Sequence, residues 1–253
     1  MILNSNFIKT HITTDKFETV NIAGDKVIEY KSVPYRWTHG ATTFHMGDGL
    51  MVYALVQHMR AKTCVCLGSG GGFIPRIMTQ ARRELFDQGI FEGNNDDNWG
   101  DIGATYIVDA ANGVGGNTNW TEEDSFFRSN FNPRVLLSTT EEAYYNHFVK
   151  EDIQIDYLHI DADHSYEGVK KDFNMYSKLV KKSGIITIHD TDQTYHDNYK
   201  VSDDIREGYH QDFDGPAKLI EELGPEWKVF NFFNEGIHIE KPSSTGFTLI
   251  QHA

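Results

Sequence analysis

A short apolar run in this chain passes directly into a cluster of glycines and then into a helical pattern. Residues 63–67 have the composition of a buried strand, residues 68–72 read GSGGG, and residues 73–86 read FIPRIMTQARRELF. Glycines between a strand and a helix allow a tight turn and let a ligand come close to bare backbone amides. This segment predicts a nucleotide-binding loop, although a plain tight turn can show the same pattern.

The alternation of strand and helix continues along the chain. Parallel strands need crossover connections, so this alternation predicts a mostly parallel sheet with helices on both faces. Further strands are expected at 104–109, 134–137, 155–161 and 184–189, and helices at 50–59, 141–149, 165–182 and 216–223. Two last strands, 227–232 and 247–252, are expected to form a hairpin.

The chain has a composition typical of a globular protein, with 39% hydrophobic and 24% charged residues. We interpret it as one domain, with an N-terminal extension or lid at 1–46 and a core at 47–253. The formal charge of −14 disfavours nucleic acid and anionic lipid as partners. No signal peptide or membrane-spanning run is evident, so a cytoplasmic location is expected. Cys64 and Cys66 share one strand face and are interpreted as reduced core residues.

An acidic residue, Asp109, ends the second strand of the predicted sheet. A carboxylate can accept hydrogen bonds from both hydroxyls of a ribose. Asp109 lies 41 positions after Gly68, whereas the ribose-binding acid of a Rossmann unit follows at roughly 20. An inserted loop at 88–103 would account for the difference, and Glu92 is the alternative candidate.

Acids and histidines end two consecutive strands in the second half of the chain. Asp161, Asp163 and His164 follow the fourth strand, and His189-Asp190 ends the fifth. Were these strands neighbours, their ends would lie roughly 5 Å apart, and the side chains would converge at the ligand edge of the sheet. An acid after a strand also commonly caps the next helix, and Asp163 suits that role. His159, inside the fourth strand, is interpreted as a core histidine.

These motifs resemble those of class I S-adenosylmethionine (SAM)-dependent methyltransferases. The G-x-G-x-G spacing is similar to their motif I, whereas a dinucleotide loop would have glycine where Phe73 stands. One departure is Cys66, where that motif usually has an acid. Residues 50–191 are similar to the methyltransferase-24 type domain and to metal-dependent O-methyltransferases of sugars and catechols. The resemblance implies a Rossmann-like three-layer α/β/α sandwich whose seven-stranded sheet ends in an antiparallel hairpin.

The resemblance also assigns roles to particular residues. SAM would be bound by the loop and two acids: Gly68, Ser69, Gly70, Gly72, Asp109 and Asp161. A divalent cation, Mg²⁺ or Mn²⁺, would be held by Asp161, His189 and Asp190. His164 would be the general base that deprotonates a small-molecule hydroxyl. His189 stands where relatives have Asp or Glu, and an imidazole points towards Mn²⁺, Fe²⁺ or Zn²⁺.

Several alternatives stay open at this level. Two histidines and a carboxylate could form a non-haem iron oxygenase site. A nicotinamide-dependent oxidoreductase and a nucleotide-binding module without catalysis are the others, and a homo-oligomer is neither favoured nor excluded. Residues 35–46, with His39 and His45, could form a lid, but we favour packing against the sheet. Four residues after the fifth strand could shape the acceptor site: Tyr195, His196, Tyr199 and His210.

Overall fold

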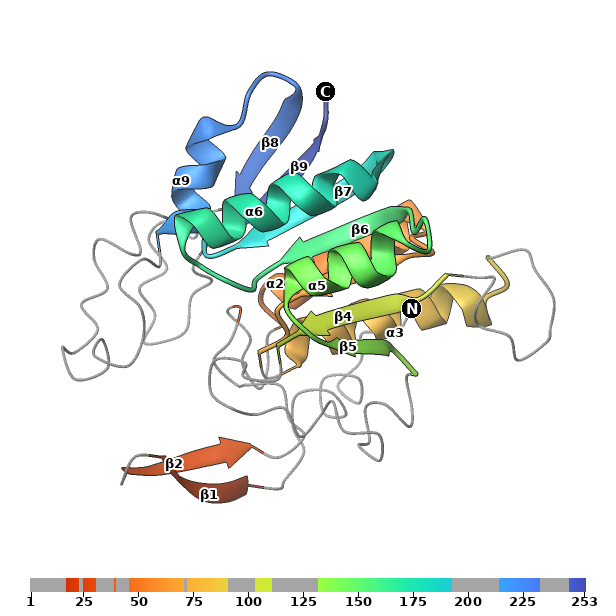
Figure 1. Ribbon diagram of the computed structural model, residues 1–253. Helices are drawn as coiled ribbons and strands as arrows, with labels where there is room; N and C mark the ends of the chain where they lie inside the picture. The colour runs from red at the N-terminus through yellow and green to blue at the C-terminus, as the bar shows by residue number, and fades with distance from the viewer. Residues whose placement is uncertain are drawn as a thin grey trace.

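The computed structural model describes residues 17–22, 25–30, 39, 46–70, 72–90, 103–110, 132–192, 214–232 and 246–253. Its main feature is a seven-stranded sheet in the order β5-β4-β3-β6-β7-β9-β8 (Figure 1). The strands are β3 (Cys64–Leu67), β4 (Thr105–Asp109), β5 (Arg134–Leu137), β6 (Ile155–Ile160), β7 (Val180–His189), β8 (Trp227–Phe232) and β9 (Phe247–His252). β3 to β7 pair in parallel, whereas β9 pairs antiparallel with both β7 and β8. The predicted sheet and its antiparallel end are confirmed.

The helices lie on both faces of this sheet, as predicted (Figure 1). α2 (Asp48–Met59) and α3 (Phe73–Asp87) cover one face. α5 (Thr140–Ala143), α6 (Tyr166–Tyr176) and α9 (Gly215–Glu222) cover the other. The π-helix η2 (Tyr144–Val149) extends α5. A separate two-stranded sheet pairs β1 (Phe17–Ile22) with β2 (Asp25–Tyr30).

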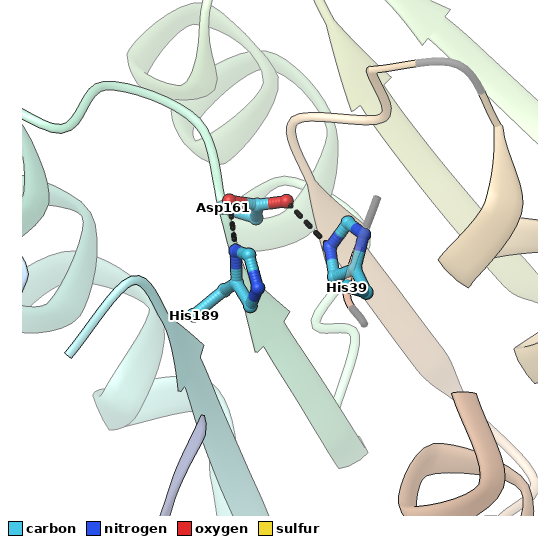
Figure 2. A group of neighbouring side chains, drawn as sticks. All are labelled: His39, Asp161 and His189. Carbon is cyan, nitrogen blue, oxygen red and sulfur yellow. Dashed lines mark hydrogen bonds and ion pairs between the residues drawn. The ribbon is translucent and has the colours of Figure 1, made fainter. Parts of the chain in front are cut away.

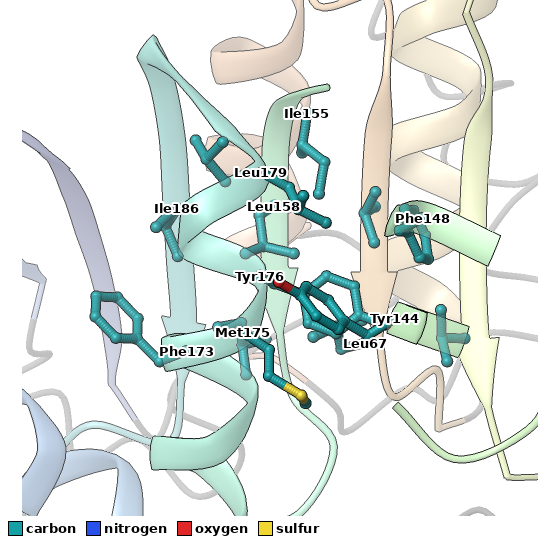
Figure 3. Packing of buried hydrophobic residues seen from close by; sticks show 14 of the residues in the cluster. Leu67, Tyr144, Phe148, Ile155, Leu158, Phe173, Met175, Tyr176, Leu179 and Ile186 are labelled. Atoms are coloured by element: carbon teal, nitrogen blue, oxygen red, sulfur yellow. The ribbon is translucent and has the colours of Figure 1, made fainter. Parts of the chain in front are cut away.

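Two hydrophobic clusters hold the three layers together. Figure 3 shows the first, which contains Phe173 and Tyr176 of α6, Phe148 of η2 and Leu158 of β6. In the second, Cys66 of β3 packs among the apolar side chains of α2 and α3. Full burial of one large apolar side chain stabilises the fold by about 1.5–3 kcal/mol. Cys64 and Cys66 are two positions apart on β3, so strand alternation places both side chains on the same face of the sheet. That face is covered by α2 and α3, and both residues are buried free thiols.

The start of α6 follows the prediction, but its end does not. Ser165 caps the helix, and its hydroxyl accepts a hydrogen bond from the Gly168 amide at 3.1 Å. The helix stops at Tyr176, and a 3-10 turn, η3 (Ser177–Leu179), leads into β7 at Val180. The expectation of a helix reaching residue 182 and a strand beginning at 184 was therefore wrong.

Pairing with β6 explains the early start of β7. Val180 pairs with Ile155, and the Lys181 ammonium lies 2.7 Å from the Asp156 carboxylate. The register then shifts before Tyr157. A Cβ on Gly184 would lie 2.5 Å from Val180 Cγ1, so the absent side chain makes room for this irregularity rather than ending a helix.

Some predictions fall outside the described residues. They concern the inserted loop beyond residue 90, Glu92, His45, and the aromatic and histidine residues of 193–213. The division into an extension and a core stays a prediction. Within the described ranges, none of the helices is both long and apolar enough to cross a membrane.

Candidate active site

The glycine loop joins β3 to α3 at the carboxyl edge of the sheet. Gly68, Gly70 and Gly72 have φ angles of 75°, 46° and 85°, a backbone region that favours glycine. A Cβ on Gly68 would lie 2.1 Å from the Asp161 carbonyl oxygen, so the loop lies directly against the end of β6. A Cβ on Gly70 would meet no atom within 4 Å. The loop is thus packed at its first glycine and open at its second.

Asp109 lies at the end of β4, next to β3, as its predicted role requires. The Ser69 amide donates to Asp109 Oδ2 at 3.1 Å, and the Ser69 hydroxyl donates to the same oxygen. Asp109 is buried. This carboxylate therefore holds the glycine loop on the β3–β4 side of the site, while its predicted contact with a ribose stays a prediction.

The acids and histidines predicted at the ends of β6 and β7 do come together, because these strands are parallel neighbours. His164 Nε2 lies 2.7 Å from Asp190 Oδ2 and 3.2 Å from Asp161 Oδ1. His189 Nδ1 lies 3.2 Å from Asp190 Oδ1 and 3.4 Å from Asp161 Oδ1. Asp190 has a left-handed φ of 56°, a strained conformation of the kind that clusters at functional sites.

One member of the cluster, His39, was not predicted to belong to it. Figure 2 shows its ring beside Asp161 and His189. Its Nε2 lies 3.0 Å from Asp161 Oδ2, and its ring stacks on that of His189 with centroids 4.1 Å apart. The only available signal was a histidine within the aromatic segment at 35–46, and no local pattern tells a lid from packing. For His39 itself, the structure shows a contact with the site.

Electrostatic coupling sets the charge of these groups. Burial alone would raise the pKa of Asp161, but the neighbouring His189, with hydrogen bonds from histidines, holds that pKa well below its usual range. Asp190 behaves in the same way. Burial disfavours a charged His164, yet its hydrogen bonds to Asp161 and Asp190 raise its pKa to about 10. The carboxylates are therefore ionised at neutral pH.

Two neighbouring residues are structural, as the sequence suggested. His159 is fully buried on β6, its Nδ1 lies 2.9 Å from the Thr187 hydroxyl, and burial lowers its pKa to about 3. Asp163 Oδ1 accepts a hydrogen bond from the Ser165 amide at 2.9 Å, at the start of α6. Neither residue belongs to the two groups of candidate metal ligands found among the described residues.

The donor atoms of the cluster suit a divalent cation. Those of Asp161, His164 and Asp190 lie within 4.8 Å of one another, and the same is true of His39, Asp161 and His189. Carboxylate and imidazole are both common ligands of divalent metals. The predicted ligands Asp161, His189 and Asp190 are thus divided between two overlapping groups that share Asp161.

A family described as a methyltransferase domain matches residues 39–191, more than half of the chain, including the glycine loop and the cluster. The chain belongs to this methyltransferase family. This assignment favours methyl transfer over the oxygenase and oxidoreductase alternatives. No curated protein matches the chain.

Solved structures of methyltransferases share the fold. One is an O-methyltransferase from Bacillus cereus in complex with S-adenosylhomocysteine (SAH), with a TM-score of 0.55, 12% identity, and coverage of 81% of this chain and 80% of that one. Another is the O-methyltransferase TomG from Streptomyces achromogenes, involved in tomaymycin synthesis and in complex with SAM, with a TM-score of 0.53, 12% identity, and coverage of 81% and 79%. At this identity the likeness concerns the Rossmann-like fold.

Proposed function

We propose that this methyltransferase transfers the methyl group of SAM to a hydroxyl of a sugar or another small metabolite, with the help of a divalent cation. The observation that carries the proposal is the adjacency of two elements. The glycine loop packs at Gly68 against the backbone of Asp161, whose carboxylate is the centre of the histidine cluster. A methyl donor on the loop and an acceptor on the cluster would therefore be neighbours, which is what in-line transfer requires.

The loop and Asp109 would bind the cofactor. Gly70 leaves the loop open to a ligand, and Ser69 ties it to the Asp109 carboxylate. A carboxylate beside the loop can accept hydrogen bonds from ribose hydroxyls. The complexes of the two structural relatives with SAH and SAM support this choice of cofactor.

The cluster would bind and activate the acceptor. Asp161, whose carboxylate belongs to both groups of candidate ligands, would hold a divalent cation, and that cation would make the acceptor hydroxyl easier to deprotonate. Asp190 lies beside Asp161 at the end of β7. Without a cation, the carboxylates of Asp161 and Asp190 raise the pKa of His164 to about 10 and keep it protonated. With a cation bound at Asp161 their negative charge would be offset, and His164 Nε2 would then take the acceptor's proton. Because Nε2 lies 2.7 Å from Asp190 and 3.2 Å from Asp161, the resulting imidazolium would be stabilised by both carboxylates.

The acceptor would be small and neutral or cationic. The formal charge of −14 disfavours phosphate-rich partners such as nucleic acids. A pair of vicinal oxygens suits chelation by a cation.

The protein would act in the cytoplasm, because its two buried free thiols are compatible with a reducing compartment.

The test is SAH formation in the presence of SAM and a panel of sugars and catechols, with and without a chelator. We expect turnover with at least one vicinal diol, at least a tenfold loss after chelation, and recovery on adding back metal. Turnover that is indifferent to chelation would contradict metal assistance. Failure of SAM or SAH to bind would contradict methyl transfer itself.

A further inference from the structure

We propose that His39, Asp161 and His189 bind a divalent transition metal through two imidazoles and one carboxylate, so that the metal of this protein is of the Zn²⁺, Fe²⁺ or Mn²⁺ class rather than Mg²⁺. The inference rests on the metal assistance in the proposed function and adds a ligand, His39, from outside the strand ends. It concerns the identity of the metal and the residues that select it.

The distances between the three side chains suit a shared ion. His39 Nε2 lies 3.0 Å from one oxygen of Asp161, and His189 Nδ1 lies 3.4 Å from the other. Metal bonds of about 2.0–2.2 Å put adjacent ligand atoms roughly 3.0–3.5 Å apart. One donor atom from each of the three residues falls within 4.8 Å of the others, so only small side-chain adjustments separate this arrangement from coordination. Figure 2 shows both rings facing the same carboxylate.

The environment of His189 is that of a metal ligand with an outer carboxylate. Its Nδ1 faces Asp161, while its Nε2 lies 3.5 Å from Asp48 Oδ2 at the start of α2. Ligating histidines usually turn their second nitrogen to a carboxylate or carbonyl, which fixes the ring and its tautomer. Asp48 is buried, so this orientation is enforced from the protein interior.

The backbone holds His39 in place at a cost. Its φ of 55° is left-handed, a strained conformation for a non-glycine residue. Its carbonyl accepts a hydrogen bond from the Asp48 amide at 2.8 Å, which joins His39 to the first turn of α2. This hydrogen bond therefore connects His39, a candidate ligand, to Asp48, whose carboxylate faces the imidazole of His189.

Ligand chemistry gives the choice of metal. Mg²⁺ prefers an octahedron of oxygen ligands, whereas imidazole suits Zn²⁺, Fe²⁺ and other transition metals. The overlapping group Asp161, His164 and Asp190 has two carboxylates and would suit an oxygen-preferring ion better. Because the two groups share Asp161, substitution of His39 distinguishes them.

The experiment measures metal binding rather than turnover. Apo protein is dialysed against Zn²⁺, Mn²⁺ or Mg²⁺ alone, and bound metal is determined by elemental analysis for wild type, His39→Ala and His39→Gln. The matched control is His58→Ala, which removes an exposed histidine of α2. Circular dichroism and SAH binding on the same samples report whether each variant is folded.

We expect wild type to bind Zn²⁺ or Mn²⁺ at least tenfold more tightly than Mg²⁺. Both His39 variants should lose at least tenfold in affinity for the transition metal, and His58→Ala should not. X-ray absorption at the metal edge should report two imidazoles in wild type and one in His39→Ala. His189→Asp should move the preference towards Mg²⁺, because an oxygen ligand replaces a nitrogen one.

Unchanged transition-metal affinity in folded His39 variants would overturn the inference, as would a wild-type preference for Mg²⁺. SAH binding without any metal binding would also overturn it while leaving methyl transfer intact. Metal bound through His39 in a protein that does not bind SAH would uphold the site and contradict the proposed function.

Discussion

Two carboxylates flank the central strand β3, and their surroundings differ sharply. Asp109 ends β4 on one side and accepts hydrogen bonds from the amide and hydroxyl of Ser69. Asp161 follows β6 on the other side and meets the imidazoles of His39, His164 and His189. Asp109 thus accepts hydrogen bonds from neutral donors of the glycine loop, whereas Asp161, at the corresponding strand end, contacts three ionisable side chains. The two sides should therefore respond to substitution independently.

The largest expected effect belongs to the β6–β7 side. His164→Gln keeps a donor between Asp161 and Asp190 but removes the group that can take the acceptor's proton. We expect kcat to fall by about 10²–10⁴-fold, the usual contribution of a general base, with SAH affinity unchanged. Steady-state kinetics and calorimetric titration of SAH measure the two quantities.

His147→Gln is the control for this substitution. His147 lies on η2 and pairs with Glu151 at 2.8 Å, away from the cluster. Its kcat should equal that of wild type. A His164→Gln enzyme that turns over at the wild-type rate would remove His164 as the base.

A smaller effect is expected on the β3–β4 side. Asp109→Asn keeps an oxygen to accept from Ser69 but loses the charge that strengthens hydrogen bonds to a ribose. Hydrogen bonds to a charged group contribute about 1.5–3 kcal/mol, so SAH affinity should fall roughly 10–100-fold, with metal content unchanged. Calorimetry and elemental analysis test both halves of the prediction. Loss of metal together with SAH would show that the two sides are coupled.

Asp172 of α6 is a buried carboxylate that extends the comparison, because its hydrogen-bond partner is a hydroxyl rather than an imidazole. Its Oδ1 accepts a hydrogen bond from the Thr140 hydroxyl at 2.5 Å, and burial raises its pKa from 3.8 to about 6. Between these values the folded state binds more protons than the unfolded state, so stability falls as pH rises through this window. Above pH 7 the full cost of the buried charge is present.

Asp172→Asn should therefore stabilise the protein by about 3 kcal/mol at pH 8 and by little at pH 4. Thermal or urea unfolding at the two pH values measures the difference. Glu221→Gln, an exposed change of the same kind on α9, should have no such pH dependence. Equal stability of wild type and Asp172→Asn at pH 8 would contradict the assignment of a buried charge.

Most of the fold could be predicted because its signals are local. Strand composition, the glycine cluster and the Ser165 cap lie within a few residues of the features they determine. The start of β7 could not be predicted in this way. Val180 continues the apolar spacing of α6, and only its pairing with Ile155 across the sheet makes it a strand residue.

The site residues also differ in whether a local sequence signal or a tertiary contact places them. The ends of β6 and β7 converge because parallel neighbours end at one edge, so Asp161, His164 and Asp190 could be placed from the pattern of strands. His39 could not, because it precedes Asp161 by 122 positions and lies in no regular element. Its approach to the cluster is a tertiary contact that no periodicity encodes.

The most direct test of the central claim, that the glycine loop binds a SAM-type cofactor, is thermal unfolding with and without SAH, with NADH as the control. A ligand at 100 times its Kd adds about 2.7 kcal/mol to stability. For a chain of this size that corresponds to a rise in Tm of roughly 5–10 °C. We predict this rise with SAH and none with NADH. No shift with SAH, or an equal shift with NADH, would contradict the account.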